Sequence, residues 1–285
     1  MKVSICGAGT MGRGIAIVCA QSGCDTVLFD VNPAALEKAV HAIHASFDSS
    51  VAKQRMTAGD AEKAKEKIIA ATTIDPMKGS DFIIEAIIEQ LDAKTDFFKV
   101  VEAEIADGTT ILASNTSSIS INSIARELQR PEQFIGLHFF NPANIMKLVE
   151  IINGVRTSSE TLQRSVAFAK QLGKTPAVAK DVPGFIVNRV ARNYYNEAQR
   201  IVTESAASIQ QVDVVMKSLG FKMGPFELMD LIGVDVNLDV TKSISAQYFN
   251  EPRFQPSVMQ QQYVDAGLHG KKTGRGFYDY TEKTE

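Results

Sequence analysis

The chain has 285 residues, of which 45% are hydrophobic and 22% are charged, and these values are typical of a folded protein with about two domains. Its net charge of −3, from 30 basic and 33 acidic residues, supplies no general positive field and argues against a nucleic-acid partner. Met1-Lys2 leads directly into a strand-like run rather than a secretory leader, and no apolar run approaches the roughly 18 residues that span a bilayer. We therefore expect a cytoplasmic protein with no membrane partner, in which Cys6, Cys19 and Cys24 are reduced.

The first half alternates short β-rich runs with longer helical patterns. This alternation predicts an α/β fold with a Rossmann-type, doubly wound, mostly parallel sheet. The expected strands are residues 3–6, 26–29, 82–85, 110–113, 134–137, 148–152 and 176–179. Residues 33–71 are rich in Ala, Lys and Glu and predict two amphipathic helices, separated at Ala58-Gly59-Asp60. One crossover needs less chain than this, so we expect the helical excursion to project from the sheet.

The pattern changes after Asp181-Val182-Pro183-Gly184, which is a helix-start signal. Apolar side chains then recur at three- and four-residue spacing, at Val187, Val190, Tyr194, Ala198 and Ile201. We expect an α/β domain over residues 1–182 and an all-α domain over residues 183–285. The apolar helical faces favour a homodimer through this second domain.

Gly7-Ala8-Gly9-Thr10-Met11-Gly12 forms a GxGxxG motif between the first expected strand and a helix. The glycines allow a tight turn and close approach of a pyrophosphate, which the helix N-terminus attracts. Asp30 ends the next expected strand, near the roughly 20-residue spacing of a ribose-binding carboxylate. The alternative is an ordinary glycine turn followed by a capping aspartate. An acid at this position would repel the 2′-phosphate of NADP, so NAD is expected as the cofactor. The positive charge of Arg13 slightly weakens this expectation.

His138 ends an expected strand, where open α/β sheets place their ligands, and Glu150 lies on or near the next strand. An imidazole can accept a hydroxyl proton as hydride leaves, and a carboxylate on its other nitrogen would fix the tautomer. A lone histidine between apolar neighbours is more often a core residue with satisfied hydrogen bonds, and the pattern alone leaves that alternative open.

Several runs, in order and spacing along nearly the whole chain, resemble the L-3-hydroxyacyl-CoA dehydrogenase family, and among its members most resemble the stand-alone bacterial 3-hydroxybutyryl-CoA dehydrogenases. They are residues 113–118 (ASNTSS), 138–142 (HFFNP), 146–150 (MKLVE), 183–189 (PGFIVNR), 223–228 (MGPFEL) and 270–278 (GKKTGRGFY). The chain departs from the family at Asn144, where a second proline is common, and at Gln90, which is often Asn. The first departure makes the rigidity of the loop between Asn141 and Glu150 less certain.

The resemblance implies roles for four catalytic residues. His138 would be the base and Glu150 its partner, Ser117 would bond the 3-oxygen of the substrate, and Asn188 would contact the reacting carbonyl region. From sequence alone, Ser117 is equally well read as a helix N-cap. Asn188 would otherwise belong to a solvated stripe with Arg192 and Gln199.

The resemblance also implies ligand contacts. The NAD contacts would be Gly7, Gly9, Thr10, Met11, Gly12, Asp30, Glu89, Lys94, Ser117, Asn141 and Lys272, and the CoA contacts would be Ser46, Lys53 and Ser117. Without the family, Lys53 is one more solvated lysine, and the polar side chains outside the glycine motif are surface charges or turn residues. His41 and His44 share a helix face but have no evident third ligand, so no metal site is expected.

These features together predict an NAD-dependent dehydrogenase of (S)-3-hydroxybutyryl-CoA, working reversibly. Residues 1–182 would be its NAD-binding domain, and residues 183–285 its substrate and dimerisation domain. Three rivals remain. The first is a dehydrogenase of longer or carboxylated esters such as 3-hydroxyadipyl-CoA. The second is a β-hydroxyacid dehydrogenase acting on free acids, whose base is a lysine on the inter-domain helix; here that helix presents Asn188 and Arg189 and no lysine, which argues against it. The third is a crystallin-like NAD-binding protein, which would be expected to lose one or more of the four catalytic residues.

Overall fold

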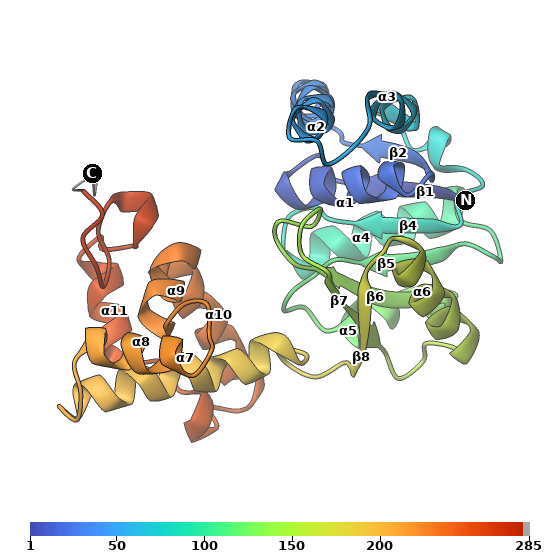
Figure 1. The fold of residues 1–285 in the computed structure, drawn as a ribbon. Helices are drawn as coiled ribbons and strands as arrows, with labels where there is room; N and C mark the ends of the chain where they lie inside the picture. Colours follow the sequence, from blue (N-terminus) through green and yellow to red (C-terminus); the bar gives the residue numbers. More distant parts are fainter. Residues whose placement is uncertain (282–285) are drawn as a thin grey trace. The chain divides into compact units, whose positions relative to one another are not determined.

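The computed structural model describes residues 1–281 (Figure 1). The chain divides into two compact units, one of residues 1–182 and one that begins at Pro183.

The first unit is built on one eight-stranded sheet, in the order β3-β2-β1-β4-β5-β6-β7-β8. Its strands are β1 (Lys2–Cys6), β2 (Asp25–Phe29), β3 (Ile68–Ala71), β4 (Phe82–Glu85), β5 (Ile111–Ser114), β6 (Phe134–Phe139), β7 (Leu148–Asn153) and β8 (Thr175–Lys180). The pairs from β3 to β6 are all parallel, β7 runs antiparallel to β6, and β8 is parallel to β7. The predicted doubly wound, mostly parallel sheet is confirmed.

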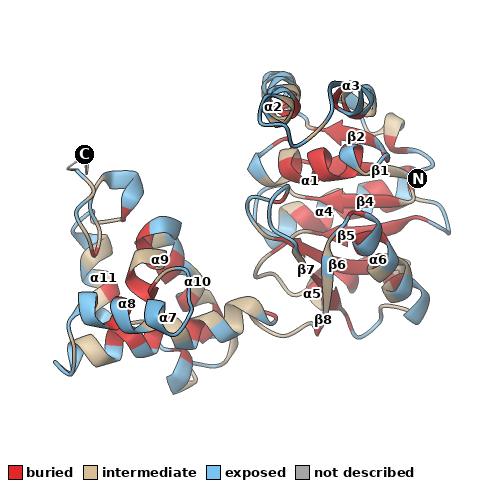
Figure 2. Cartoon of the chain, in the orientation of Figure 1, coloured by how far each residue is buried: buried red, intermediate tan, exposed pale blue. Residues whose placement is uncertain are grey.

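The chain winds outward from β1 to β3, returns to β4 and then winds the opposite way. Because such crossovers are right-handed, the helices of the two halves cover opposite faces of the sheet. The helices are α1 (Thr10–Gln21), α2 (Pro33–Ala52), α3 (Ala58–Glu66), α4 (Leu91–Glu104), α5 (Ile121–Ala125) and α6 (Ser159–Gln171), with 3-10 turns at Asp75–Met77 and Pro131–Gln133. In Figure 2 the buried residues gather in the strands and along α1, which fill the core of this unit.

The helical excursion differs from its prediction in two ways. Residues 68–71 form a short strand, β3, at the edge of the sheet beside β2. The excursion, which was expected to project from the sheet, also packs on the core, where Leu36, Ile43 and Phe47 of α2 are buried. Figure 1 shows α2 and α3 side by side near β2.

The second unit is helical, as predicted. Its helices are α7 (Val187–Thr203), α8 (Ile209–Ser218), α9 (Pro225–Ile232), α10 (Val234–Gln247) and α11 (Val258–Asp265), with 3-10 turns at Pro252–Phe254 and Lys271–Thr273. Tyr195, Phe226, Met229 and Phe277 contribute to its own hydrophobic core.

The interpretation of α7 as an apolar stripe opposite a solvated polar stripe is wrong in two respects. Val190 is 65% exposed, whereas Arg192 and Gln199 are buried. The guanidinium of Arg192 donates 2.8 Å hydrogen bonds to the Asn237 carbonyl and to the Thr241 hydroxyl, both on α10. Burial lowers the pKa of Arg192 to about 10. These internal partners let polar side chains occupy the buried face of the helix.

Candidate active site

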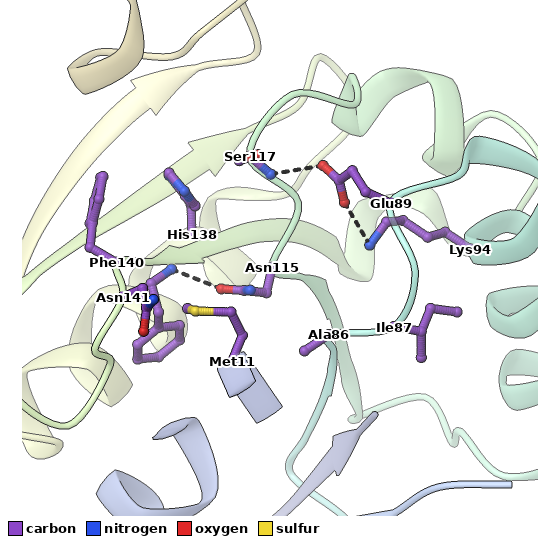
Figure 3. Close-up of a pocket in the computed structure, with 11 residues that line it drawn as sticks. Met11, Ala86, Ile87, Glu89, Lys94, Asn115, Ser117, His138, Phe140 and Asn141 are labelled. Carbon is purple, nitrogen blue, oxygen red and sulfur yellow. Dashed lines mark hydrogen bonds and ion pairs between the residues drawn. The ribbon is translucent and has the colours of Figure 1, made fainter. Parts of the chain in front are cut away.

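The candidate site lies at the carboxyl ends of the parallel strands, around the point between β1 and β4 where the strand order reverses. Open α/β sheets bind ligands there. A cavity of about 350 Å³ is lined by Met11, Ala86, Ile87, Glu89, Lys94, Asn115, Ser117, His138, Phe139, Phe140 and Asn141. Figure 3 shows these side chains around it. Six of the residues expected to bind ligands or take part in catalysis therefore line one cavity: Met11, Glu89, Lys94, Ser117, His138 and Asn141.

His138 and Glu150 lie directly opposite each other in the antiparallel pairing of β6 and β7. Nδ1 of His138 is 2.7 Å from Oε2 of Glu150, and the Glu150 side chain is fully buried. An ionised carboxylate only accepts hydrogen bonds, so Nδ1 donates and Nε2 of a neutral imidazole carries no proton. This arrangement can hold one tautomer and stabilise an imidazolium.

Lys94, at the start of α4, lines the cavity and forms ion pairs with two carboxylates. Its Nζ donates to Oε1 of the buried Glu85 at 2.5 Å and lies 3.0 Å from Oε2 of Glu89. Glu85 also accepts from the Ser114 hydroxyl and from the Ile87 amide, each at 2.7 Å. Burial raises the pKa of Glu85, although Lys94 and these hydrogen bonds oppose that effect. The Lys94 side chain, which is only 1% exposed, is therefore held in place by the carboxylates of Glu85 and Glu89.

Glu89 connects this cluster to the loop that carries Ser117. Its carboxylate accepts from the Ser117 amide at 3.0 Å, from the Ser118 hydroxyl at 3.2 Å and from the Thr116 hydroxyl. Burial acts to raise the pKa of Glu89, but the charge of Lys94 and these hydrogen bonds outweigh it and leave the pKa below its usual value. The helix cap on this loop is Ser120, which accepts from the Ser123 amide, so the N-cap interpretation of Ser117 is wrong.

A second cavity, of about 510 Å³, fits the adenosine side of a dinucleotide. It is lined by Gly7, Gly9, Phe29, Asp30, Val31, Ala86, Ile87, Ile88 and Phe97. A Cβ on Gly12 would lie 1.8 Å from the Gly7 carbonyl oxygen. A Cβ on Gly7 would lie 2.5 Å from the Ala86 carbonyl oxygen. A Cβ on Gly9 meets nothing within 4 Å. Gly7 and Gly12 thus satisfy packing, whereas Gly9 borders open space that a pyrophosphate can approach.

Asp30 faces this second cavity from the end of β2. Its carboxylate accepts from the Ala8 amide at 2.7 Å and from the Asn32 amide at 2.9 Å, which fixes it between the glycine loop and α2. The residues present therefore fit NAD, with Asp30 available to a ribose.

Six of the expected contacts line neither of these two cavities, and one of them is Gly12 of the glycine loop. Thr10 and Ser46 line a third cavity, and Lys53 is exposed at the C-terminal end of α2. Asn188, on α7, and Lys272 belong to the second unit, where the Lys272 ammonium pairs with Asp235 at 2.6 Å. Within residues 1–281, no three His, Cys, Asp or Glu side chains gather as a metal site, and no helix is long and apolar enough to cross a membrane.

Sequence reasoning missed Glu85 and Asn115. The Asn115 amide oxygen accepts from the Phe139 backbone amide at 2.9 Å and so joins β5 to the strand end that carries His138. Glu85 is the last residue of β4, and Asn115 is the residue directly after β5; a polar residue at the carboxyl end of a strand is the signal that could have identified both.

A glycine loop at the switch point of a doubly wound sheet is typical of a dinucleotide-binding domain. Residues 2–182 match the 3-hydroxyacyl-CoA dehydrogenase NAD-binding domain, and residues 184–280 match the C-terminal domain of that family. The chain therefore belongs to the 3-hydroxyacyl-CoA dehydrogenase family, and its first unit is the NAD-binding domain. The predicted membership of an NAD-dependent enzyme family is confirmed.

Named relatives cover nearly the whole chain. It is 43% identical over 284 residues to the 3-hydroxyadipyl-CoA dehydrogenase of Escherichia coli. This match covers 99% of the present chain but only 60% of the length of the Escherichia coli protein. It is 40% identical to the 3-hydroxybutyryl-CoA dehydrogenase of Bradyrhizobium diazoefficiens, over 98% of this chain and 95% of that one. The crystal structure of the (S)-3-hydroxybutyryl-CoA dehydrogenase of Ralstonia eutropha is similar with a TM-score of 0.94, at 40% identity over 99% of both chains.

Proposed function

We propose that this chain catalyses the reversible, NAD-dependent oxidation of (S)-3-hydroxybutyryl-CoA to acetoacetyl-CoA. The observation that carries the proposal is the buried His138–Glu150 pair beside the cavity that adjoins the glycine loop. Relatives that carry the name 3-hydroxybutyryl-CoA dehydrogenase match this chain over nearly their full length and support the substrate.

His138 is the proposed catalytic base. It accepts the proton of the 3-hydroxyl while Glu150 holds Nδ1–H and stabilises the imidazolium that forms. NAD, when bound, accepts the hydride from C3. In the reverse direction the imidazolium returns the proton to the 3-oxygen.

Ser117 is proposed to donate to the 3-oxygen, and Glu89 keeps the Ser117 loop in place through the Ser117 amide. Donors that are fixed before the reaction stabilise developing charge without reorganisation. Asn188 is proposed to contact the reacting carbonyl region.

For NAD itself, the proposed contacts are the glycine loop with Thr10 and Met11, then Asp30, Glu89, Lys94, Ser117, Asn141 and Lys272. The proposed contacts to CoA are Ser46, Lys53 and Ser117.

A homodimer through the helical unit is part of the proposal. Valines and larger side chains are exposed on and just after α8, at Val214, Val215, Leu219 and Phe221. A second copy of this chain is the proposed occupant of this surface, and sedimentation of a Leu219→Asp variant as a monomer would support it. The buried, unpaired thiols of Cys6, Cys19 and Cys24 are in keeping with a reducing compartment, so the cytoplasm is the proposed location.

A second candidate substrate is a longer or ω-carboxylated ester, which the Escherichia coli relative named 3-hydroxyadipyl-CoA dehydrogenase favours. The test compares kcat/KM with NADH for acetoacetyl-CoA, 3-oxohexanoyl-CoA, 3-oxoadipyl-CoA and free acetoacetate. The proposal predicts the highest value for acetoacetyl-CoA and little turnover of the free acid. A higher value for 3-oxoadipyl-CoA would replace the substrate, and the absence of turnover of every ester by protein that binds NADH would overturn the function.

A further inference from the structure

Residues 140–147 form the loop that joins β6 to β7, and this loop borders the proposed active site. Asn141, near its start, lines the cavity that His138 also lines (Figure 3). Most of the loop is exposed, and Ala143 is its one buried residue. A Cβ on Gly14 of α1 would lie 3.0 Å from the Cβ of Ala143, so α1 packs closely against the middle of the loop. Apolar packing thus supports the loop at a single residue, and its other contacts are polar.

The centre of the loop is one helical turn. The amides of Ile145 and Met146 both donate to the Pro142 carbonyl, at 3.0 and 2.9 Å. The carbonyl groups at the C-terminal end of such a turn need partners from outside it. Asn144, within the turn, does not fix the backbone as a proline would. The conformation of the loop therefore depends on what its free carbonyl groups contact.

The side chain of Lys174 supplies those partners. Its Nζ donates to the Ala143 carbonyl at 2.6 Å and to the Met146 carbonyl at 2.9 Å. Burial lowers the pKa of Lys174, and no carboxylate within residues 1–281 forms an ion pair with it. The carbonyl groups of the loop are therefore the partners of this charge, in the way that lysines commonly bond the last carbonyls of a helix.

Lys174 is itself held by regular structure, in the short connection between α6 and β8. Its backbone amide donates to the Ala169 carbonyl of α6 at 3.0 Å. The next amide, of Thr175, donates to the Lys147 carbonyl at 2.8 Å and begins the pairing of β8 with β7. An ammonium group on this base can act as a fixed clamp on an exposed loop.

We propose that Lys174 is a positioning residue of the NAD site, which holds the turn at residues 142–146 and thereby keeps Asn141 at the wall of the reaction cavity. This inference rests on the proposed function, because the contact of Asn141 with NAD is part of that proposal. His138 and Glu150 need no such clamp, since the pairing of β6 with β7 places them opposite each other. Lys174 thus acts on cofactor binding and not on proton transfer.

The first test measures the loop in the full chain without ligands. Hydrogen exchange followed by mass spectrometry should be faster over residues 140–147 in Lys174→Met than in wild type, because the turn loses two hydrogen bonds. Lys170→Met is the matched control, because it removes the same charge from an exposed position in the last turn of α6. The loop of this control should exchange like that of wild type. Equal loop exchange in Lys174→Met and wild type would overturn the proposal.

The second test is a double-mutant cycle on the dissociation constant of NADH, measured by fluorescence titration without acyl-CoA. Asn141→Ala and Lys174→Met should each weaken NADH binding about five- to tenfold, and Lys170→Met should bind like wild type. Because Lys174 acts through Asn141, the double variant should bind NADH within about twofold of Asn141→Ala alone. Losses that multiply in the double variant, or a loss shared by Lys170→Met, would contradict the proposal.

The titrations separate this inference from the proposed function. A loss of NADH affinity in Asn141→Ala but not in Lys174→Met would overturn the inference alone. Wild-type affinity in Asn141→Ala would overturn the proposed NAD contact and the inference with it. Failure of wild type to reduce acetoacetyl-CoA would overturn the proposed substrate and leave the role of Lys174 standing, since no acyl-CoA takes part in either test.

Discussion

Nδ1 of His138 lies 2.7 Å from Oε2 of Glu150, across the one antiparallel pair of the described sheet. The reversal of β7 brings together two residues that are only 12 positions apart and puts them directly opposite on adjacent strands. The connection from β6 to β7 can be short because the two strands are antiparallel, whereas the crossover to a parallel neighbour takes a dozen or more residues. The local change of strand direction therefore builds the proposed base and its partner.

Glu150→Gln should lower kcat by about a hundredfold or more, because positioned general acid–base groups contribute about 10² to 10⁴ and the amide no longer stabilises the imidazolium. The KM for acetoacetyl-CoA and the dissociation constant of NADH should change little. Steady-state kinetics and NADH fluorescence titration measure these quantities. Glu160→Gln, at an exposed position in the first turn of α6, is the control, and a kcat loss shared by both variants would count against the pair.

Gly9→Ala and Gly12→Ala should separate cofactor contact from packing. A Cβ on Gly9 meets no protein atom within 4 Å, so the variant should keep its melting temperature without ligand and bind NADH more weakly. A Cβ on Gly12 would lie 1.8 Å from the Gly7 carbonyl oxygen, so that variant should lose stability as well as binding. Thermal melts with and without NADH distinguish the two. Equal loss of melting temperature in both variants would refute this division of roles.

Asp30→Asn should shift the cofactor preference towards NADPH. The carboxylate would face a 2′-phosphate as a like charge, which costs several kcal/mol, so its removal should lower the NADH-to-NADPH ratio of kcat/KM about tenfold or more. Arg13→Gln should leave that ratio unchanged, because Arg13 faces a different cavity from Asp30. An NADH-to-NADPH ratio that changes in Arg13→Gln but not in Asp30→Asn would contradict the role of Asp30 in cofactor preference.

Glu89 should contribute stability at neutral pH that is lost in acid. Its folded-state pKa is lowered, so its contribution is complete above the unfolded value of about 4.3 and disappears as the pH falls through the folded value. Urea midpoints of wild type and Glu89→Gln, measured from neutral to acidic pH, should therefore differ most at neutral pH and converge in acid. Glu66→Gln, at an exposed position of α3, should show no such convergence. A gap between wild type and Glu89→Gln that widens in acid would contradict the sign of the shift.

Local pattern predicted seven of the eight strands, because each is an apolar run bounded by turn signals. The strand β3 was missed because it follows a helix closely, has four residues and buries only Ala71 fully. It is recognisable only through its pairing with β2. Short edge strands of this kind carry little periodic signal.

The polar interior of the protein was the least predictable part. Sequence patterns assign Arg192 and Gln199 to solvent and give no sign that Glu85 is buried, since charged and amide side chains are seldom buried. Each becomes favourable inside only because distant residues supply its partners, such as Thr241 for Arg192 and Lys94 for Glu85. The site residues on β6 and on the glycine loop were more accessible to prediction, because their places at strand ends follow directly from the order of strands along the chain.

The central claim is that His138 is the catalytic base. The most direct measurement is the single-turnover rate of NADH loss with saturating acetoacetyl-CoA, for wild type and for His138→Gln. The account predicts a rate about 10² to 10⁴ lower in the variant, with the dissociation constant of NADH and the melting temperature nearly unchanged. A variant that turns over at the wild-type rate while binding NADH normally would contradict the account, and the proton acceptor would have to be another residue.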